Sequence, residues 1–244
     1  LIKQLRKIAD ENGVLLLEDA AESFGASTGG KKTGTLGESS VFSFCQNKVF
    51  TTGEGGCVVT HDDQVSKKLD HFRSYGREMA GDYFNSNLPV DYVELGYNWR
   101  MSSLVAALGV SQIMRIGKLI DARRRIALRY DRGLKKVEGI STYSAPKDDV
   151  CVYQMYTIRV SGGSENRDAL SKRLEARGIT SKVYFEPAHK YSLFRGMNYR
   201  DQLPVTERMS AEALSLPIFP TMTDAQVDRV VRTIVEFQGE NGGE

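Results

Sequence analysis

Residues 39–60, SSVFSFCQNKVFTTGEGGCVVT, contain two short apolar segments on either side of a polar, glycine-rich stretch. The segments SSVFSF and GCVVT are rich in β-branched and aromatic residues, which predicts a strand at each. The intervening CQNKVFTTGEGG is too polar and too rich in turn-forming residues to continue either strand. Lys48 is therefore expected in a loop between two strands.

A further apolar run, VLLLED at residues 14–19, lies upstream. A short continuous apolar run is typical of a strand buried in a parallel sheet. It ends in Glu18 and Asp19, so acidic groups emerge at the carboxyl end of a strand, where open α/β sheets place their ligands. An amphipathic segment at residues 2–13 predicts a helix before this strand. GASTGGKKTGTLG at residues 25–37 predicts a loop or a short ribbon after it.

The pattern changes after about residue 130, and we predict two domains. Residues 1–130 are expected to form an α/β domain with a mostly parallel sheet, and residues 131–244 a smaller α+β domain. Ser102 or Ser103 can cap a long helical stretch that bends near Gly117. The other expected elements are helices over 62–76, 101–137, 164–178, 206–214 and 223–237, strands over 152–160 and 179–185, and a long loop over 76–98.

Composition excludes several classes of function. The 244 residues carry 33 basic and 31 acidic side chains, so no charge surplus suggests a nucleic-acid partner. Three histidines and three widely spaced cysteines argue against a metal centre. Without a signal peptide or a membrane-spanning apolar run, the reducing cytoplasm is the expected location and no membrane partner is expected. Leu1 opens directly into a helical segment with neither Met nor cap, which predicts a missing N-terminal part.

Asp19, Ser43 and Lys48 each allow a structural and a functional interpretation. Asp19 can close a turn, or a buried carboxylate there can pair with the cationic ring nitrogen of a cofactor. Lys48 can be a surface lysine, or a partly desolvated amine that is neutral often enough to act as a nucleophile. The Ser43 hydroxyl can bond to nearby backbone or donate to a phosphate. Each signal is weak when taken alone.

Three motifs in order strengthen the functional interpretation. EDAAESFGA (18–26), FSFCQNKVFTTGEGG (42–56) and LGYNWRMSSLVAALGVSQ (95–112) together resemble the DegT/DnrJ/EryC1/StrS family of pyridoxal-phosphate (PLP) dependent sugar aminotransferases. The likeness covers nearly the whole chain and includes LPIFPTMTDAQVDRVV (216–231). It implies the type I fold of PLP-dependent transferases, in the aspartate aminotransferase superfamily. In that fold a three-layer large domain has a mainly parallel sheet, incomplete here at its N-terminus, and a small C-terminal α+β domain follows.

The resemblance also implies roles for individual residues. Lys48 would carry the cofactor as a Schiff base and move the proton during transamination, and Asp19 would hold the pyridinium nitrogen. Ser43 would bind the cofactor phosphate. Asn98 would reach that phosphate from the partner subunit of a homodimer with a shared active site, with Arg100 close by.

The alternative for Asn98 and Arg100 is a loop turn and a surface ion pair. His189, in EPAHKY, falls where the family has a histidine near the substrate.

Two departures from the family pattern matter. Glu22 stands beside the cofactor ring where the family usually has Gln. An acid there would repel the cofactor's phenolic oxygen unless it is protonated or paired. The N-terminal part that supplies a phosphate-binding turn and a stacking aromatic in the family is also expected to be missing, so half of the cofactor pocket is expected here. Lys48, in place of the histidine of related dehydratases, argues against that branch.

The implied activity is transfer of an amino group, from glutamate, to a nucleotide-linked keto-sugar in amino-sugar, polysaccharide or antibiotic sugar biosynthesis. A non-catalytic PLP-binding or regulatory relative of the same fold is the main alternative, motivated by Glu22 and the incomplete N-terminus. A generic nucleotide-binding α/β domain is disfavoured, because no glycine-rich phosphate loop of known spacing leads into a helix.

Overall fold

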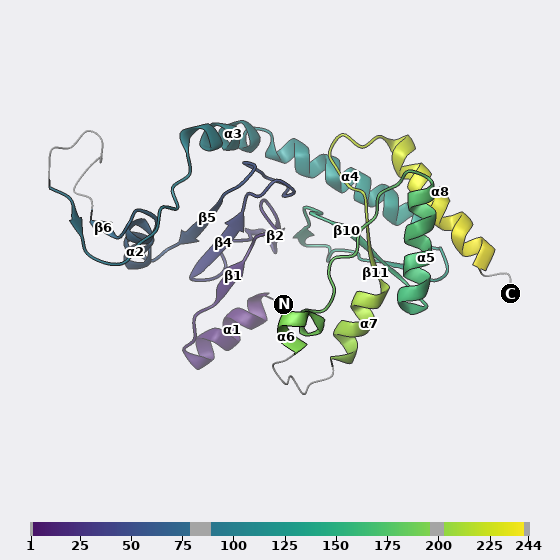
Figure 1. Cartoon of the computed structure of the whole chain (residues 1–244), viewed down its shortest axis with the longest axis horizontal. Helices are drawn as coiled ribbons and strands as arrows, with labels where there is room; N and C mark the ends of the chain where they lie inside the picture. Colours follow the sequence, from purple (N-terminus) through teal and green to yellow (C-terminus); the bar gives the residue numbers. More distant parts are fainter. Residues whose placement is uncertain (1, 79–88, 196–202, 242–244) are drawn as a thin grey trace. The chain divides into compact units, whose positions relative to one another are not determined.

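The computed structural model describes residues 2–78, 89–195 and 203–241 (Figure 1). Its contacts divide the chain into two compact units: Leu1–Gly117 with Asp148–Val150, and Lys118–Lys147 with Cys151–Glu244. This division lies near the start of helix α4 (Ile116–Leu134), whereas the predicted domain boundary at residue 130 lies near its end. The difference arises because the buried face of α4, which includes Ile126 and Tyr130, packs into the core of the second unit.

A three-stranded sheet forms the centre of the first unit, in the order β1 (Leu17–Asp19), β4 (Ser39–Ser43), β5 (Gly56–Thr60). β1 and β4 are parallel, and β4 and β5 are antiparallel (Figure 1). The antiparallel pair forms because the chain folds back on itself after β4, with the Gly55 carbonyl accepting from the Phe44 amide at 2.8 Å. The three strands and the parallel pairing predicted from sequence are therefore confirmed.

The burial of β1 differs from the prediction. Leu17 is 67% exposed and Leu15 is 74% exposed, although the apolar run had predicted a buried strand. β1 is an edge strand of the described sheet, so only β4 lies beside it. Apolar composition thus predicted the strand and its parallel neighbour correctly but was wrong about its burial.

Short elements surround this sheet. The glycine-rich stretch forms the expected ribbon, in which β2 pairs with β3 and with β9. Helix α2 begins after Asp62, whose carboxylate accepts hydrogen bonds from two amides of the first turn, and helix α3 begins after Ser102, which caps it as predicted. Part of the predicted 76–98 loop is instead a two-stranded ribbon, and its residues 79–88 lie outside the described residues. The bounds are α1 (Ile2–Asn12), β2 (Ser27–Thr28), β3 (Lys31–Lys32), α2 (Asp63–Arg73), β6 (Arg77–Glu78), β7 (Asp91–Tyr92), α3 (Ser103–Ile113) and β9 (Asp149–Val150).

The second unit is built on an antiparallel sheet in the order β11, β10, β8. Along β10 the side chains of Tyr156, Ile158 and Val160 are buried and alternate with half-buried ones, as expected for a strand with one face on a core. Buried residues of α4, α5 and α8 complete that core. The bounds are β8 (Ile140–Thr142), β10 (Tyr156–Val160), α5 (Gly163–Ala176), η1 (Ala188–Lys190), α6 (Ser192–Arg195), α7 (Pro204–Glu212), β11 (Ala213–Leu216) and α8 (Asp224–Asn241).

Two predictions for the second unit are wrong. The expected strand at 179–185 makes only one isolated bridge, from Lys182 to Ser215. The helix expected over 206–214 ends at Glu212, and the next four residues form β11. Both differences arise from pairing with β10. β11 is the strand that hydrogen-bonds to β10 on that side, so residues 179–185 do not. The first two residues of β11 had been predicted as helix from their helix propensity.

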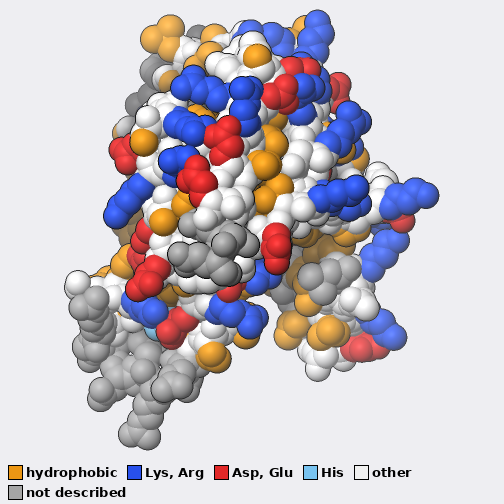
Figure 2. All heavy atoms as spheres, turned by 90° about the vertical axis from the view of Figure 1, so that its right-hand side faces the viewer, with side chains coloured by type: hydrophobic (Ala, Val, Ile, Leu, Met, Phe, Trp, Pro, Cys, Tyr) orange, Lys and Arg blue, Asp and Glu red, His pale blue; other side chains and the backbone are white. Residues whose placement is uncertain are grey.

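Charged side chains of both signs are interspersed on the face seen in Figure 2. Ion pairs between α4 and α8 show the same mixture within the second unit: Arg129 binds both carboxylate oxygens of Asp228 at 2.6 Å and also contacts Asp224. Among the described residues no single helix is long and apolar enough to cross a membrane. Helices α3 and α4, which meet at a bend, reach the length and apolar composition of a membrane span only when they are taken together.

Candidate active site

The carboxyl ends of β1 and β4 lie at one edge of the sheet, because the two strands are adjacent and parallel. Asp19 is the last residue of β1 and pairs with Val41, two residues before Ser43 at the end of β4. Lys48 follows in the turn after β4, where its amide donates to the Cys45 carbonyl at 3.0 Å. The structure therefore brings the loops that carry Asp19, Ser43 and Lys48 to the same edge.

Lys48 meets Glu22 and not Asp19. Its Nζ lies 3.0 Å from Glu22 Oε1, and its side chain is 14% exposed while that of Glu22 is 47% exposed. Asp19 Oδ1 accepts a hydrogen bond from the Ala21 amide at 3.1 Å, which is the turn-closing contact considered from sequence. The acid at position 22 is thus a paired acid, and sequence reasoning did not foresee this partner.

An aromatic cluster holds the two loops together. The rings of Phe24 and Phe50 stack with centroids 4.5 Å apart, and Phe44 meets both rings edge-on. Phe24 lies two residues after Glu22, and Phe50 lies two residues after Lys48, so the stack joins the same two loops as the ion pair. Phe44 and Phe50 are buried. Sequence reasoning missed Phe24, although the repeated aromatics around the lysine were visible.

Glu18 anchors the glycine-rich loop and does not face a ligand. Its carboxylate accepts hydrogen bonds from the Gly34 and Gly37 amides, each at 2.8 Å, and from that of Leu36. Each of these amides would otherwise need another acceptor. Of the two acids at the end of β1, Asp19 does not anchor that loop, and it is exposed, whereas the functional interpretation had expected a buried carboxylate.

The segment carrying Asn98 and Arg100 runs along the end of α2. Asn98 forms an isolated bridge with Ser74, and the Trp99 amide donates to the Arg73 carbonyl at 3.0 Å. The Arg100 guanidinium lies 5.0 Å from the centroid of the Tyr75 ring, a cation–π contact. No hydrogen bond or ion pair joins Asn98 or Arg100 to Lys48 within the part of the chain that the structure describes.

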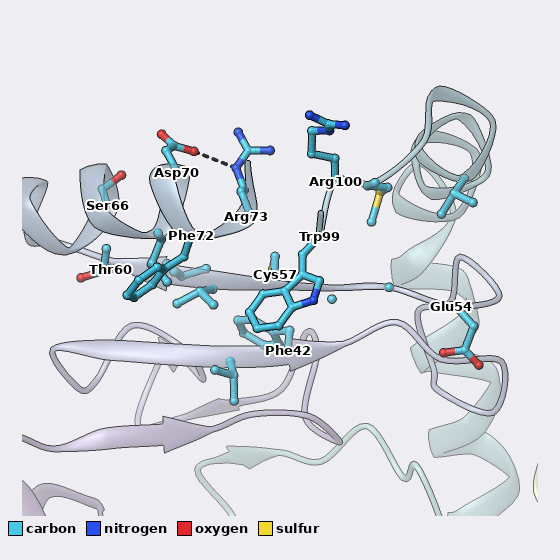
Figure 3. A pocket seen from close by; sticks show the side chains of 18 of the residues that line it. Phe42, Glu54, Cys57, Thr60, Ser66, Asp70, Phe72, Arg73, Trp99 and Arg100 are labelled. Carbon is cyan, nitrogen blue, oxygen red and sulfur yellow. Dashed lines mark hydrogen bonds and ion pairs between the residues drawn. The ribbon is translucent and has the colours of Figure 1, made fainter. Parts of the chain in front are cut away.

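An open apolar groove of about 1170 Å³ lies beside β4 and β5 (Figure 3). The Trp99 ring lies near Phe42 and Cys57 on its floor, and the Asp70–Arg73 ion pair lies at its rim. Arg100 is one of its lining residues, but Lys48 is not. The groove is therefore a separate feature from the lysine site.

His189 belongs to the second unit, on η1. Its Nε2 lies 3.1 Å from Glu207 Oε1, and Lys190 Nζ lies 3.1 Å from Oε2 of the same carboxylate. Hydrogen bonds from Lys190 and then His189 hold the pKa of Glu207 below its usual range. His189 is thus fixed to the first turn of α7, and one of its ring nitrogens is engaged.

The family model for DegT/DnrJ/EryC1/StrS aminotransferases matches residues 2–235. The chain belongs to this family. It is 34% identical over 234 residues to a GDP-perosamine synthase from Caulobacter vibrioides, covering 93% of the chain and 60% of the relative. It is 32% identical over 241 residues to a pleiotropic regulatory protein from Geobacillus stearothermophilus, covering 97% of the chain and 61% of the relative.

Solved structures show the same fold. Helicobacter pylori PseC, an aminotransferase involved in the biosynthesis of pseudoaminic acid, superposes with a TM-score of 0.90 at 26% identity, covering 98% of this chain and 63% of that one. The family resemblance and the fold class predicted from sequence are confirmed. The chain spans about 60% of the length of the relatives that it matches.

The family's cofactor is PLP, and the residues present fit it. Lys48 supplies an amine whose stem is enclosed and whose only charged partner among the described residues is Glu22. Asp19 Oδ2 makes no hydrogen bond within the described residues, and the Ser43 hydroxyl only accepts, from the Cys45 amide at 3.4 Å. An amine, a carboxylate and a hydroxyl thus lie at the same end of the sheet, and they are the groups that would be needed to hold an aldehyde, a cationic ring nitrogen and a phosphate.

Proposed function

We propose that the whole protein is a PLP-dependent aminotransferase that transfers an amino group from glutamate to a nucleotide-linked keto-sugar. The observation that carries this proposal is the enclosed Lys48 amine at the edge where β1 and β4 end, together with Asp19 and Ser43. A relative named GDP-perosamine synthase supports the sugar substrate.

Three residues have direct roles in this proposal. Lys48 Nζ is the amine that would hold the cofactor through its aldehyde group and would take up and return the proton in transamination. The Asp19 carboxylate, which accepts only from the Ala21 amide among the described residues, would hold the ring nitrogen in its protonated form, and the Ser43 hydroxyl would donate to the phosphate. When bound, PLP supplies an electron sink for the carbon that loses its proton.

Asn98 and Arg100 are proposed to reach the cofactor phosphate of the partner subunit in a homodimer. Their exposure supports a role outside their own subunit, since neither side chain is enclosed by the described part of the chain. His189 is proposed to contact the substrate, with Glu207 fixing its ring. The cytoplasm is the proposed location, in keeping with Cys45, Cys57 and Cys151, which are all free thiols.

The central test is borohydride reduction of the protein with PLP, followed by peptide mapping. We expect one reduced adduct, on Lys48. Lys48→Ala should lose both the adduct and transamination, because it removes the enclosed amine on which the proposal rests. Lys67→Ala is the matched control: Lys67 is also ion-paired, 2.7 Å from Glu78, but lies on α2, and this variant should keep both properties. An adduct on a different lysine would refute the assignment.

A non-catalytic regulator is the second candidate, favoured by the relative named pleiotropic regulatory protein. Such a protein would still bind PLP through Lys48 but would not convert it. Addition of glutamate separates the two candidates, because an aminotransferase changes the cofactor's absorption to that of the amine form. An unchanged spectrum with a normal Lys48 adduct would favour the regulator.

A further inference from the structure

Tyr75 contacts two guanidinium groups just after helix α2. The central carbon of the Arg77 guanidinium lies 5.1 Å from the centroid of the Tyr75 ring, and that of Arg100 lies 5.0 Å from it, so both arginines make cation–π contacts. The two arginines differ in burial. Arg77 is 4% exposed and its Nε donates to the Ser74 carbonyl at 3.1 Å, whereas Arg100 is exposed. Arg77 is therefore part of the interior of the first unit, and Arg100 is the arginine that can meet a ligand.

The backbone of Tyr75 has an uncommon conformation. Its φ is +66°, in the left-handed region that bulky residues rarely adopt because the Cβ atom crowds the backbone. The Tyr75 amide donates to the Tyr97 carbonyl at 2.9 Å, so the stretch that leads to Arg100 runs beside it. Backbone strain of this kind persists only where surrounding contacts compensate for it, and it is common at ligand sites. Here the strained residue is the one that places a ring against the Arg100 guanidinium.

An aromatic ring supports an arginine in a different way from a carboxylate. A carboxylate uses N–H donors of the guanidinium and offsets its charge, as Asp70 does for Arg73 at 2.8 Å. A cation–π contact requires neither an N–H···O bond nor an opposite charge. No ion pair engages Arg100 in the part of the chain that the structure describes, so its planar set of donors and its charge stay available. Such a planar set matches the oxygens of a phosphate group.

The direction of the Arg100 side chain agrees with a role outside the groove. In Figure 3 the Trp99 ring points toward Phe42 and Cys57, on the floor of the groove. The Arg100 guanidinium points away from them, on the side where Arg73 also lies. The donors of Arg100 are therefore turned away from the apolar floor.

We propose that Tyr75 is a positioning residue for Arg100: its ring holds the guanidinium in place and leaves the N–H donors for the cofactor phosphate of the partner subunit. The inference rests on the proposed function for the role of Arg100. Because a free arginine side chain has many rotamers to lose, holding it before the ligand arrives lowers the entropic cost of binding. The ring should therefore raise the affinity for the phosphate group and for no other part of the cofactor.

A comparison of PLP with pyridoxal, which has the same ring and aldehyde but no phosphate, tests this inference in the whole protein. We expect Tyr75→Asn to raise the dissociation constant of PLP by about 3-fold, as for the loss of an exposed cation–π contact, and to leave that of pyridoxal unchanged. Asn accepts a positive φ, so the backbone conformation is kept while the ring is lost. Absorbance titration measures both constants. A purely structural role of Tyr75 would weaken the binding of both ligands equally.

Three further variants complete this comparison. Tyr75→Phe keeps the ring and should bind PLP as the wild type does. Tyr75→Gly also accepts a positive φ, and it repeats the measurement if Tyr75→Asn fails to fold. Tyr92→Leu is the matched control: Tyr92 is 64% exposed on the neighbouring strand β7, while Tyr75 is 42% exposed, and the loss of the Tyr92 ring should change neither dissociation constant.

A double-mutant cycle connects the ring to Arg100. Arg100→Met should raise the dissociation constant of PLP, and the addition of Tyr75→Asn should raise it no further, because the ring then has no guanidinium to hold. Additive effects of the two substitutions, or an unchanged PLP constant in Tyr75→Asn, would overturn the role of Tyr75.

Failure of this inference is distinguishable from failure of the proposed function. If Arg100→Met itself left PLP binding unchanged, the proposed phosphate contact of Arg100 would be wrong, and the role of Tyr75 would be wrong with it. The borohydride adduct on Lys48 is independent of both results, so an adduct on another lysine would remove the aminotransferase proposal separately.

Discussion

Two tyrosines of the second unit, Tyr130 and Tyr156, stack in its core with ring centroids 4.8 Å apart. The Tyr130 hydroxyl donates to the Pro217 carbonyl at 2.8 Å, and that of Tyr156 donates to Asp131 Oδ1 at 2.6 Å. Burial raises the pKa of both phenols far above the ordinary value, since a phenolate there would lose its hydration. For Tyr156 the hydrogen bond to Asp131 adds to the shift in pKa.

These shifts predict alkaline destabilisation. Tyrosine in the unfolded chain loses its proton near pH ~10, while the folded protein keeps both protons, so the unfolded state binds fewer protons and stability falls as the pH rises above that value. Tyr156→Phe should lower the free energy of unfolding by about 1 kcal/mol at pH ~7, through the lost hydrogen bond, and should flatten the decline between about pH 9.5 and 11. Urea unfolding across this range measures both effects.

The exposed Tyr143→Phe is the matched control and should change neither quantity. An equally steep alkaline decline in Tyr156→Phe would show that Tyr156 is not one of the groups that retain their protons in the folded protein.

The placement of the segment with Asn98 and Arg100 depends on a close crossing of two stretches of backbone. A Cβ on Gly76, which has φ +72°, would lie 1.7 Å from the Glu94 carbonyl oxygen, and a Cβ on Gly96 would lie 1.9 Å from the Gly76 nitrogen. The two stretches of backbone therefore lie too close together for any residue with a Cβ atom at either position. This crossing, which lies just after α2, fixes the backbone that carries Asn98 and Arg100, the side chains proposed to bind phosphate.

Gly96→Ala should therefore displace this segment and lower the free energy of unfolding by about 3 kcal/mol, since neither backbone can move aside cheaply. Trp99 is the only tryptophan of the chain and stacks on Tyr97 at 4.3 Å, so its fluorescence reports the displacement directly. Gly117→Ala is the control: no atom lies within 4 Å of the added Cβ, and in helix α4 it should stabilise by up to about 1 kcal/mol. Unchanged stability and emission in Gly96→Ala would contradict the argument.

Helix caps could be predicted from the sequence, whereas one strand and one ion pair could not. Ser102 caps α3 as its position predicted, because a cap depends only on neighbours in the chain, and Asp62 caps α2 in the same way. The strand at Ala213–Leu216 could not be predicted in the same way, since its residues suit a helix and only the ladder with β10 makes them a strand. The Glu22–Lys48 pair was equally invisible, because its partners lie on different loops and meet only when β1 and β4 pair.

At the scale of the whole molecule the two units differ in how their cores are closed. The main buried cluster belongs entirely to the second unit, where helices α4, α5 and α8 pack on the sheet. In the first unit the edge strands keep apolar side chains in solvent: Val58 on β5 is 45% exposed, and Leu17 on β1 is 67% exposed. Motifs alone identified the family of both units, but the exposure of these strands depends on what covers them and required the structure.

This difference predicts unequal local stability. Amides of β10 should exchange with deuterium far more slowly than those of β5, because opening β10 exposes a buried core while opening β5 exposes little new apolar surface. Hydrogen–deuterium exchange with mass spectrometry measures this contrast. In parallel, Ile158→Ala, which truncates a fully buried side chain of β10, should cost about 4 kcal/mol, and Val58→Ala in β5 less than about 1 kcal/mol. Equal protection of the two strands, with a large cost at Val58, would mean that β5 is covered in solution by something beyond the described residues.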